Sequence, residues 1–224
     1  IIIWLAAIVG DGACSINKKL TYKINRDTVK WLCNNYKKGK IVFASTCSVY
    51  GKNEQIINKD TIPNPLSDYA KSKLQAEFFI KKRNNNYLII RLGTLFGIGD
   101  KFSRLRLDLV ANILTTRSAN NQELTVFGGD QWRPMLHVKD VANAISFFLK
   151  KNSVGTFNLA YKNFRIFDIA KEIKKLNKST KVKKVEQKFE DQRNYRIDLK
   201  TLQKTGWKNK FLLSDGIKEI FNAI

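Results

Sequence analysis

The segments IVFASTCSVYG (residues 41–51) and SDYAKSKLQAE (residues 67–77) decide the fold of this chain. The first is an apolar run that ends in a Ser-Thr pair, and the second places Tyr69 and Lys73 four residues apart. On a helix, this spacing brings both side chains onto one face, one turn apart. A fixed ammonium beside a phenol favours the phenolate, which would let Tyr69 act as a base near neutral pH. Thr46, at the end of the strand, supplies a hydroxyl for the same substrate oxygen.

Apolar strands alternate with helical segments along the first 97 residues, which predicts a parallel α/β sheet. Strands are expected at 1–8, 40–45 and 86–93, and helices at 20–38 and from an N-cap at Ser67. The polar segment 52–67 contains two prolines and is expected to be a loop. The first strand, at residues 1–8, is expected to be buried.

Beyond residue 97 the pattern changes, and a smaller lobe is expected. The sequence predicts helices at 104–117, 138–151, 167–176 and 215–224, with short strands at 124–128 and 155–160. We therefore assign residues 1–97 to the sheet with its catalytic strand and helix. Residues 98–224 are assigned mainly to the second lobe, with a soft boundary because segments are expected to cross back to the sheet.

Composition excludes several classes of protein. Among the 224 residues, the three cysteines form no C-x-x-C pair, which favours a reduced, cytoplasmic setting. The longest apolar run, the first nine residues, is too short to span a membrane. A formal charge of +22 suits a nucleic-acid surface, but the lysines are spread along the chain without a nucleic-acid-binding motif. A solvated basic surface is the favoured interpretation, and no metal-ligand cluster is expected.

Blocks along nearly the whole chain resemble the extended short-chain dehydrogenase/reductases, specifically the NAD-dependent nucleotide-sugar epimerases and dehydratases. They are IIIWLAAIVG (1–10), INRDT (24–28), the two segments above, IIRLGTLFG (89–97), FGGDQWRPMLHVKDVANAI (127–145), VGTFNLA (154–160) and DQRNY (191–195). The resemblance implies a Rossmann-like parallel sheet with a smaller α/β substrate-binding lobe. It also implies NAD as cofactor (NADP is not excluded), a nucleotide-diphosphate sugar as substrate, and a homodimer.

The same resemblance implies the roles of individual residues. Tyr69 would be the base, Lys73 would lower its pKa and bind the nicotinamide ribose, and Thr46 would hold the reacting hydroxyl. Further residues are implied near the cofactor: Ala6, Asn25, Ser45, Leu92 and Gly93. Substrate contacts are implied for Thr94, Arg133 and Arg193, of which the two arginines would bind the diphosphate. His137 and Asp140 are expected to be structural.

The residues after Thr46 favour one reaction over others. Dehydratases of this family carry an Asp-Glu pair at the positions of Cys47 and Ser48, so loss of water is disfavoured here. Oxidation to a keto sugar followed by re-reduction, as in a 4-epimerase, is the first hypothesis, and one-way 4-keto reduction is the second. A non-catalytic remnant that binds sugar nucleotides remains a third hypothesis, and a nucleic-acid module rests on charge alone.

The family's glycine-rich turn, G-x-x-G-x-x-G, does not occur in the sequence, which begins with Ile1. That turn belongs to the first strand-helix unit, where a helix N-terminus binds the cofactor pyrophosphate. We therefore expect an N-terminally truncated piece of a longer enzyme, lacking the first βαβαβ portion and inactive as it stands. An exposed sheet edge, and with it poor solubility, is a further expectation.

Overall fold

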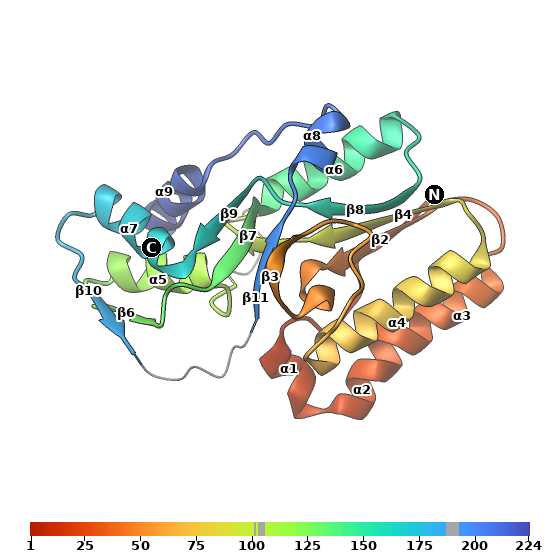
Figure 1. The fold of residues 1–224 in the computed structure, drawn as a ribbon, viewed down its shortest axis with the longest axis horizontal. Coiled ribbons are helices and arrows are strands. Elements are labelled where there is room, and N and C mark those ends of the chain that lie inside the picture. Colours follow the sequence, from red (N-terminus) through yellow and green to blue (C-terminus); the bar gives the residue numbers. More distant parts are fainter. Residues whose placement is uncertain (101, 103–105, 187–192) are drawn as a thin grey trace.

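A four-stranded parallel sheet forms the centre of the computed structural model, which describes residues 1–100, 102, 106–186 and 193–224 (Figure 1). Its strands, in spatial order, are β1 (Ile2–Trp4), β2 (Ile41–Thr46), β4 (Tyr87–Leu92) and β8 (Gly155–Leu159). β2 and β4 pair along their whole length, from Ile41 opposite Tyr87 to Thr46 opposite Leu92. The expected parallel α/β sheet is confirmed.

Helices cover both faces of this sheet, as Figure 1 shows. One face carries α3 (Thr28–Asn35) and α4 (Asp68–Arg83), and the other carries α6 (Val138–Lys150). Because successive side chains of a strand point to opposite faces, Phe43 packs in the cluster under α3 and α4. Its neighbour Val42 packs in the cluster under α6. Two-sided burial is why β2 and β4 read as continuous apolar runs.

The segment before α3 is helical but irregular. It comprises α1 (Asp11–Ile16), α2 (Lys18–Tyr22) and a π-helical turn at Lys23–Asp27. The sequence predicted one helix over 20–38, so position and type are confirmed. The π turn had no signal in the hydrophobic pattern.

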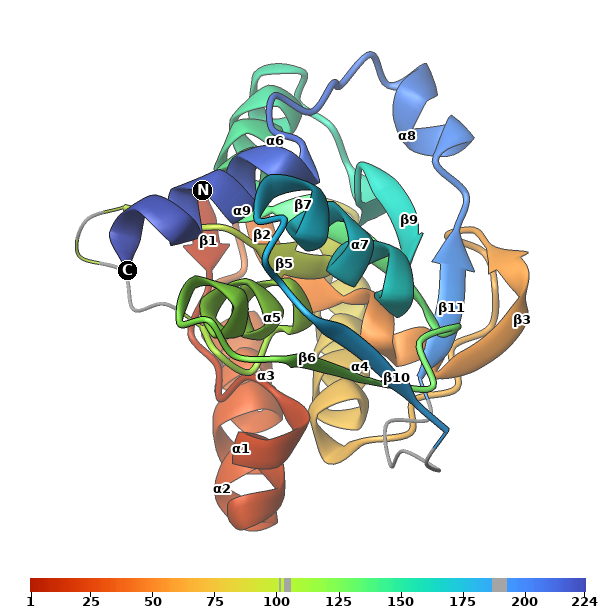
Figure 2. The same cartoon turned by 90° about the vertical axis from the view of Figure 1, so that its left-hand side faces the viewer.

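The second lobe has its own core, in which α5, α7 and α9 pack on short strands (Figure 2). The helices are α5 (Val110–Ala119), α7 (Ile166–Leu176) and α9 (Leu213–Ala223). One small sheet has the order β5 (Thr94–Phe96), β7 (Trp132–His137), β9 (Lys162–Arg165), and a parallel pair joins β6 (Leu124–Phe127) to β10 (Val182–Val185). The helix expected from residue 104 begins at Val110 here, and residues 103–105 lie outside the described part of the chain.

Two predictions about the strands are wrong, one about where a strand forms and one about whether a strand is buried. The segment expected to be a loop over 52–67 contains a strand, β3 (Lys52–Ile57), which pairs in parallel with β11 (Asn194–Ile197). Its partner lies some 140 residues away, so no local pattern revealed it. β1 is not buried: Ile3 is 45% exposed, because among the described strands β1 is an edge strand that pairs with β2 alone.

The chain returns to the central sheet after residue 97. β8 pairs with β4, and α6 covers the same sheet, although both follow the expected boundary. A short helix, α8 (Lys200–Lys204), adds Leu202 to the cluster beneath α6. Residue 97 therefore divides the sequence into two segments, but it does not divide the structure into two lobes as cleanly. The boundary stays a proposal.

Candidate functional site

The carboxyl end of β2 and the start of α4 form the candidate site. Thr46 ends the strand, and its hydroxyl accepts a hydrogen bond from the backbone N–H of Ser48 at 3.1 Å, which turns the chain away from the sheet. Ser67 caps α4 as expected, accepting from the backbone N–H of Ala70 at 3.2 Å. In open α/β sheets, ligands bind beyond the carboxyl ends of the strands. Two local capping interactions therefore place Thr46 and Tyr69 at this edge.

Tyr69 lies close enough to Thr46 for their side chains to hydrogen-bond. That both hydroxyls bind one substrate oxygen stays a prediction. Burial raises the pKa of the Tyr69 phenol to about 12, while the Thr46 hydroxyl and the charge of Arg106 act to lower it. The lowered pKa that was expected from Lys73 is not found, because the cost of burying the phenolate dominates.

Lys73 lies beneath the helix rather than at its surface. Its residue is 2% exposed, and its ammonium nitrogen lies 4.2 Å from the centre of the Phe43 ring. Burial lowers the pKa of Lys73 to about 8, against the charges of Glu77 and Cys14, which raise it. The ammonium is therefore charged at neutral pH, and a modest rise in pH would remove its proton.

Asn25 fixes the segment that leads from β1 into α1. Its Oδ1 accepts from the backbone N–H of Ile8 at 2.8 Å, and its Nδ2 donates to the Ile8 carbonyl at 2.9 Å. Nδ2 also reaches the Ser72 hydroxyl at 3.2 Å, which links this segment to α4. The expected contact of Asn25 with backbone near the cofactor loop is confirmed. Ala6, on the same segment, is exposed.

Leu92, the last residue of β4, lies at the same edge of the sheet and is followed by Gly93 and Thr94. Gly93 donates its backbone N–H to the Leu159 carbonyl at 2.9 Å, and a Cβ there would meet the Pro134 carbonyl oxygen at 2.6 Å. This close approach explains why a glycine stands at position 93. Leu92 and Thr94 flank it and are half-buried. Ser45 points instead into the protein, where its hydroxyl donates to Glu77 at 2.5 Å.

The two arginines predicted to bind the diphosphate lie together, although sixty positions separate them in sequence. The Arg133 guanidinium donates to the Arg193 carbonyl at 2.5 Å. The Arg193 guanidinium forms an ion pair with Asp11 at 3.1 Å. β7, the segment before β11, and α1 therefore meet at this point. Asp191 and Gln192, which belong to the same predicted block, lie outside the described residues.

Sequence reasoning missed two charged residues near Tyr69. Asp11 raises the pKa of Tyr69, and Arg106 lowers it. Arg106 pairs with Asp108 through a hydrogen bond of 2.7 Å from its Nε. Neither residue stands in a motif with a known role, and Asp11 offered one weak signal, since it follows Gly10 at the end of the first apolar run.

His137, Asp140 and Cys47 have the structural roles that were expected of them. His137 is fully buried, and its Nε2 lies 3.0 Å from the Glu219 carboxylate. Asp140 accepts hydrogen bonds from the backbone N–H groups of Lys210 and Phe211, at 3.0 and 3.1 Å. Cys47 has no exposed surface, and burial raises its thiol pKa to about 12. The thiol is therefore unsuited to act as an acid or a nucleophile.

Within the described ranges, no group of three or more His, Cys, Asp or Glu side chains is arranged to hold a metal ion. Among the described helices, none has the length and apolar character needed to cross a membrane.

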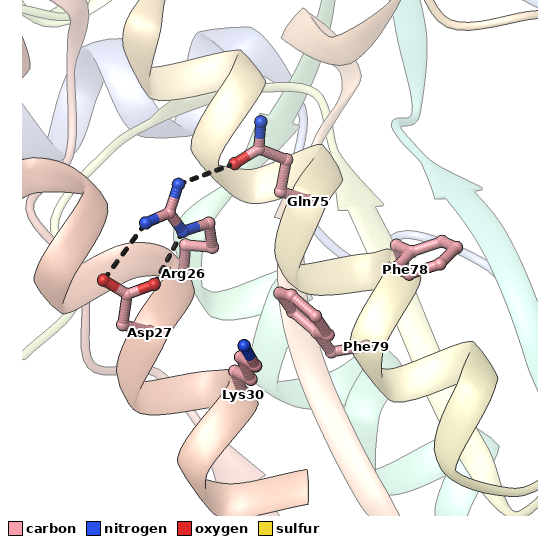
Figure 3. Close-up of a pocket in the computed structure, with 6 residues that line it drawn as sticks. All are labelled: Arg26, Asp27, Lys30, Gln75, Phe78 and Phe79. Carbon is pink, nitrogen blue, oxygen red and sulfur yellow. Dashed lines mark hydrogen bonds and ion pairs between the residues drawn. The ribbon is translucent and has the colours of Figure 1, made fainter.

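A shallow pocket of about 270 Å³ lies away from this edge of the sheet, between α3 and α4 (Figure 3). Arg26, Asp27 and Lys30 form one wall, and the opposite wall comes from α4. Figure 3 shows Phe78 and Phe79 on that second wall. The Arg26 guanidinium bonds Asp27 at 2.6 Å and reaches Gln75 at 3.4 Å across the pocket. None of the predicted catalytic residues lines it.

Comparison with known proteins gives a family. A family model described as the NAD dependent epimerase/dehydratase family matches residues 1–160.

Solved structures share the fold over almost the whole chain. A UDP-glucuronic acid 4-epimerase from Bacillus cereus, in complex with UDP-glucuronic acid and NAD, is 25% identical, with a TM-score of 0.81. The match covers 99% of this chain and 74% of that one. A UDP-N-acetylglucosamine 4-epimerase from Methanobrevibacter ruminantium M1, in complex with UDP-N-acetylmuramic acid, is 23% identical, with a TM-score of 0.84 over 98% of this chain and 74% of that one. A UDP-glucose 4-epimerase from Thermotoga maritima, with UDP-glucose, is 23% identical, with a TM-score of 0.81 over 98% and 75%. The last two support the fold alone.

Proposed function

The chain belongs to the NAD-dependent epimerase/dehydratase family, and from that membership we propose that it serves as a nucleotide-sugar 4-epimerase. The observation that carries the proposal is the contact between Thr46 and Tyr69 at the carboxyl end of β2, with Lys73 one helical turn along α4 from Tyr69. The Bacillus cereus relative, a 4-epimerase bound to NAD and UDP-glucuronic acid, supports the same reaction and cofactor.

In this proposal Tyr69 takes the proton from a sugar hydroxyl, and Thr46 holds that hydroxyl in place. The raised pKa of Tyr69, about 12, means that the phenol is protonated at rest. A base with so high a pKa holds a proton firmly, so Tyr69 needs a neighbouring positive charge when it accepts and returns the proton. Arg106, whose charge acts to lower the pKa of Tyr69, would supply it, together with Lys73, one turn along α4. The residues therefore contribute orientation and electrostatics.

The residues at this edge fit the nicotinamide end of NAD. Tyr69 and Lys73 would offer donors for ribose hydroxyls, and Gly93 would let a flat ring approach the end of β4. Ser45, whose hydroxyl is turned toward Glu77, would contribute its backbone. When bound, NAD would take up and return the hydride. Asn25 would act indirectly, by fixing the backbone of Ile8, and exposed Ala6 and half-buried Leu92 would border the group. NADP remains an alternative.

Arg133 and Arg193 suit the diphosphate of a nucleotide sugar. Guanidinium groups bind phosphate oxygens through paired donors, and the structure brings these two residues into direct contact. Thr94, at the start of β5, follows β4 of the central sheet and precedes both arginines in sequence. It would contact the sugar. UDP-glucuronic acid is bound in the Bacillus cereus relative, so a nucleotide-diphosphate sugar is the proposed class.

The missing carboxylates after Thr46 separate epimerisation from dehydration. Cys47 is buried with a thiol pKa of about 12, so it does not replace the acid that removal of water would require. One-way 4-keto reduction uses the same residues and is the second candidate.

The proposal is tested on the protein produced from its complete coding sequence. It is incubated with NAD and a panel of UDP-, GDP-, CDP- and dTDP-sugars, and Tyr69→Phe is assayed beside it. We expect one sugar to be converted to its 4-epimer, at a rate that falls by about 10²- to 10⁴-fold in the variant. A reduced sugar formed only from a 4-keto substrate would favour the ketoreductase. No turnover and no NAD binding would refute the enzyme and leave a sugar-nucleotide-binding protein.

We further propose that two copies associate through the outer face of α3 and α4, as the family resemblance implies. Phe78, which lines the pocket of Figure 3, is 60% exposed, and Trp31 on α3 is 62% exposed. A second copy would cover these rings and pair the charges of Arg26 and Asp27 with its own. Phe78→Lys should convert a dimer to a monomer in sedimentation velocity. Ile62→Lys, at a site 86% exposed and outside this face, should not; a monomeric wild-type protein would contradict the proposal.

A further inference from the structure

A buried carboxylate lies on α4, one turn beyond Lys73. The side chain of Glu77 is 1% exposed. It accepts hydrogen bonds from the Ser45 hydroxyl at 2.5 Å and from Arg91, through Nε at 3.0 Å and Nη2 at 2.7 Å. Lys81, at the helix surface, lies 3.4 Å from the same carboxylate. Both carboxylate oxygens are therefore bound, and the charge is paired.

The position of Glu77 follows from two periodicities. Tyr69, Lys73 and Glu77 follow one another at four-residue spacing, so they form one stripe along α4. On β2, alternation directs Phe43 and Ser45 to the face that α4 covers, where Phe43 meets Lys73 and Ser45 meets Glu77. Lys73 and Glu77, the two residues of the stripe that follow Tyr69, therefore each contact one residue of β2.

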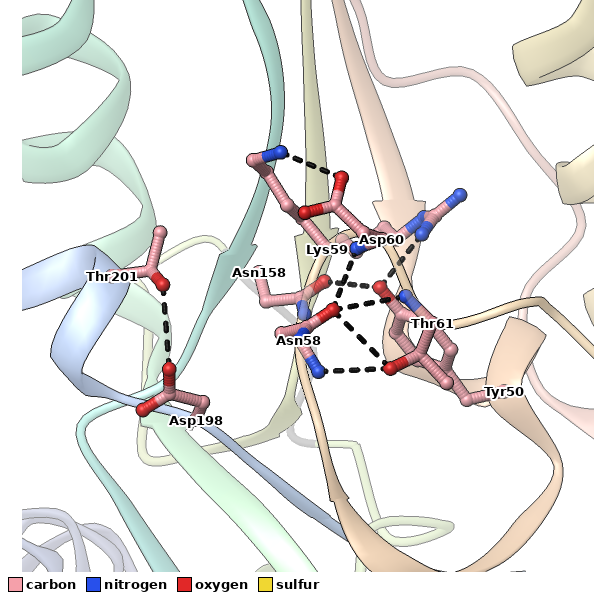
Figure 4. Close-up of polar contacts among 9 residues, drawn as sticks. Tyr50, Asn58, Lys59, Asp60, Thr61, Asn158, Asp198 and Thr201 are labelled. Atoms are coloured by element: carbon pink, nitrogen blue, oxygen red, sulfur yellow. Dashed lines mark hydrogen bonds and ion pairs between the residues drawn. The ribbon is translucent and has the colours of Figure 1, made fainter.

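The contacts continue across the sheet. Arg91, on β4, donates through Nη1 to the Tyr50 hydroxyl at 2.7 Å. Tyr50 in turn donates to the Asn158 side chain on β8 at 2.9 Å, a contact drawn in Figure 4. Glu77 thus connects α4 to three neighbouring strands. It bonds Ser45 on β2 and Arg91 on β4, and through Arg91 and Tyr50 it reaches β8. A buried network whose members are all bonded fixes a single arrangement of the elements that carry it.

The charge of Glu77 acts on the two buried cations near it, Arg91 and Lys73. Burial by itself would lower the pKa of Arg91, but the hydrogen bonds and charge of Glu77 raise it overall. Burial lowers the pKa of Lys73 to about 8, and Glu77 is the strongest influence in the opposite direction. Cys14, on α1, is the other titratable group that raises it, and β2 presents the uncharged Phe43 ring.

We propose that Glu77 is a positioning residue for the Tyr69–Lys73 pair: its carboxylate, bound by Ser45 and Arg91, fixes α4 on the sheet and places a negative charge one helical turn from Lys73. The inference rests on the proposed function for its catalytic meaning, and it stands independently of that function as a statement about Lys73. A residue that served only to hold the helix would leave the titration of Lys73 unchanged.

The test measures that titration directly. Lysine labelled with ¹³C at Cε is incorporated, and the Lys73 signal is assigned by its absence in Lys73→Arg and followed by NMR against pH. Glu77→Gln keeps the shape and one acceptor but removes the charge. We expect the Lys73 pKa to fall by about one unit in this variant. Glu172→Gln, which removes an exposed helical carboxylate paired with Lys175, should leave the Lys73 titration unchanged.

A second variant guards against loss of the fold, because removal of one partner of a buried ion pair is strongly destabilising. Glu77→Gln/Arg91→Met removes both charges and is therefore expected to fold. The Lys73 pKa should fall in this protein as well, since Glu77 is the strongest of the charges that raise it. An unchanged Lys73 titration in either folded variant would overturn the proposal.

The pH–rate profile provides a separate readout. If Lys73 must be charged, the alkaline limb of epimerase activity should move to lower pH in Glu77→Gln by the same amount as the Lys73 pKa. A shifted Lys73 titration without any epimerase activity in the wild-type protein would sink the proposed function while supporting the role of Glu77 toward Lys73. Epimerase activity with an unshifted pH–rate profile in Glu77→Gln would support the proposed function and contradict the role of Glu77 toward Lys73.

Discussion

The ammonium nitrogen of Lys73 lies 4.2 Å from the centre of the Phe43 ring, in an environment that leaves the residue 2% exposed. A cation over an aromatic face is attracted by the ring quadrupole, but this attraction recovers only part of the hydration that burial removes. Burial lowers the pKa of Lys73 to about 8, although the charges of Glu77 and Cys14 act to raise it. Lys73 is thus a site where the fold maintains a charge at a cost in stability.

Replacement of Lys73 by methionine should therefore stabilise the protein at neutral pH. A lysine with a folded pKa near 8 and an ordinary pKa of 10.5 is destabilising when protonated. The penalty is fully present below pH 8 and disappears as pH rises from 8 to 10.5. Lys73→Met should raise the free energy of unfolding by roughly 1 to 3 kcal/mol at pH 7 and have little effect at pH 10.5. Urea unfolding at both pH values, with the exposed Lys71→Met as control, measures the difference.

Asp140 should prove essential for the connection between α8 and α9. Its carboxylate is fully buried and accepts from two consecutive backbone N–H groups, those of Lys210 and Phe211. Asp140→Asn places an amide donor against one of these donors and should cost about 1 to 3 kcal/mol of stability. Amide exchange at residues 210 and 211 should accelerate with it. Asp168→Asn, in the exposed first turn of α7, is the matched control, and equal effects of the two changes would contradict this role.

Asn25 should control the order of the segment that leads into the site. Asn25→Asp keeps an acceptor for the Ile8 N–H but places a carboxylate oxygen against the Ile8 carbonyl, where an amide donor stood. We expect a loss of about 1 to 3 kcal/mol, because a buried charge is left facing an acceptor. Hydrogen exchange at the Ile8 amide reports the local effect. In Asn35→Asp, whose side chain bonds the Trp31 carbonyl at the surface, exchange at Ile8 should not change.

The single histidine should remain neutral over the physiological range. Nδ1 of His137 accepts from the Lys139 backbone N–H, so Nε2 carries the proton and donates to Glu219. Burial lowers the pKa of His137 below 6.5, although Glu219 acts to raise it. Its contribution to stability is present above pH 6.5 and is lost as pH falls toward the folded pKa.

NMR of the one imidazole signal tests this assignment. Glu219→Gln removes the charge that favours protonation, so the His137 pKa should fall further. Glu123→Gln, at an exposed loop position, should leave it in place. A His137 pKa above 6.5 in the wild-type protein would show that Glu219, and not burial, decides its charge state.

Much of the central sheet was predictable because its signals are local. β2 and β4 are apolar on both faces, so their sequences read as continuous runs, and Ser67 marks the start of α4 by a capping interaction three residues long. β3 was not predictable, since its strand character depends on pairing with β11 far along the chain. β1 was misjudged in burial for the same reason: exposure depends on what lies beside the strand.

Within the candidate site, spacing alone placed Tyr69 and Lys73 on one face of a helix, because 3.6 residues per turn is a property of the backbone. The resemblance to the family then gave Tyr69 and Lys73 their proposed roles. The sequence by itself therefore determined the parallel sheet, the residues of α4 that share one face, and the identity of the candidate catalytic residues.

Only the tertiary structure decided the charge states of these residues, since burial raises the pKa of Tyr69 and lowers that of Lys73. It also decided which distant residues meet, such as Arg133 with Arg193 and Glu77 with Arg91. Desolvation and long-range pairing are set by neighbours in space, and a linear pattern does not contain them.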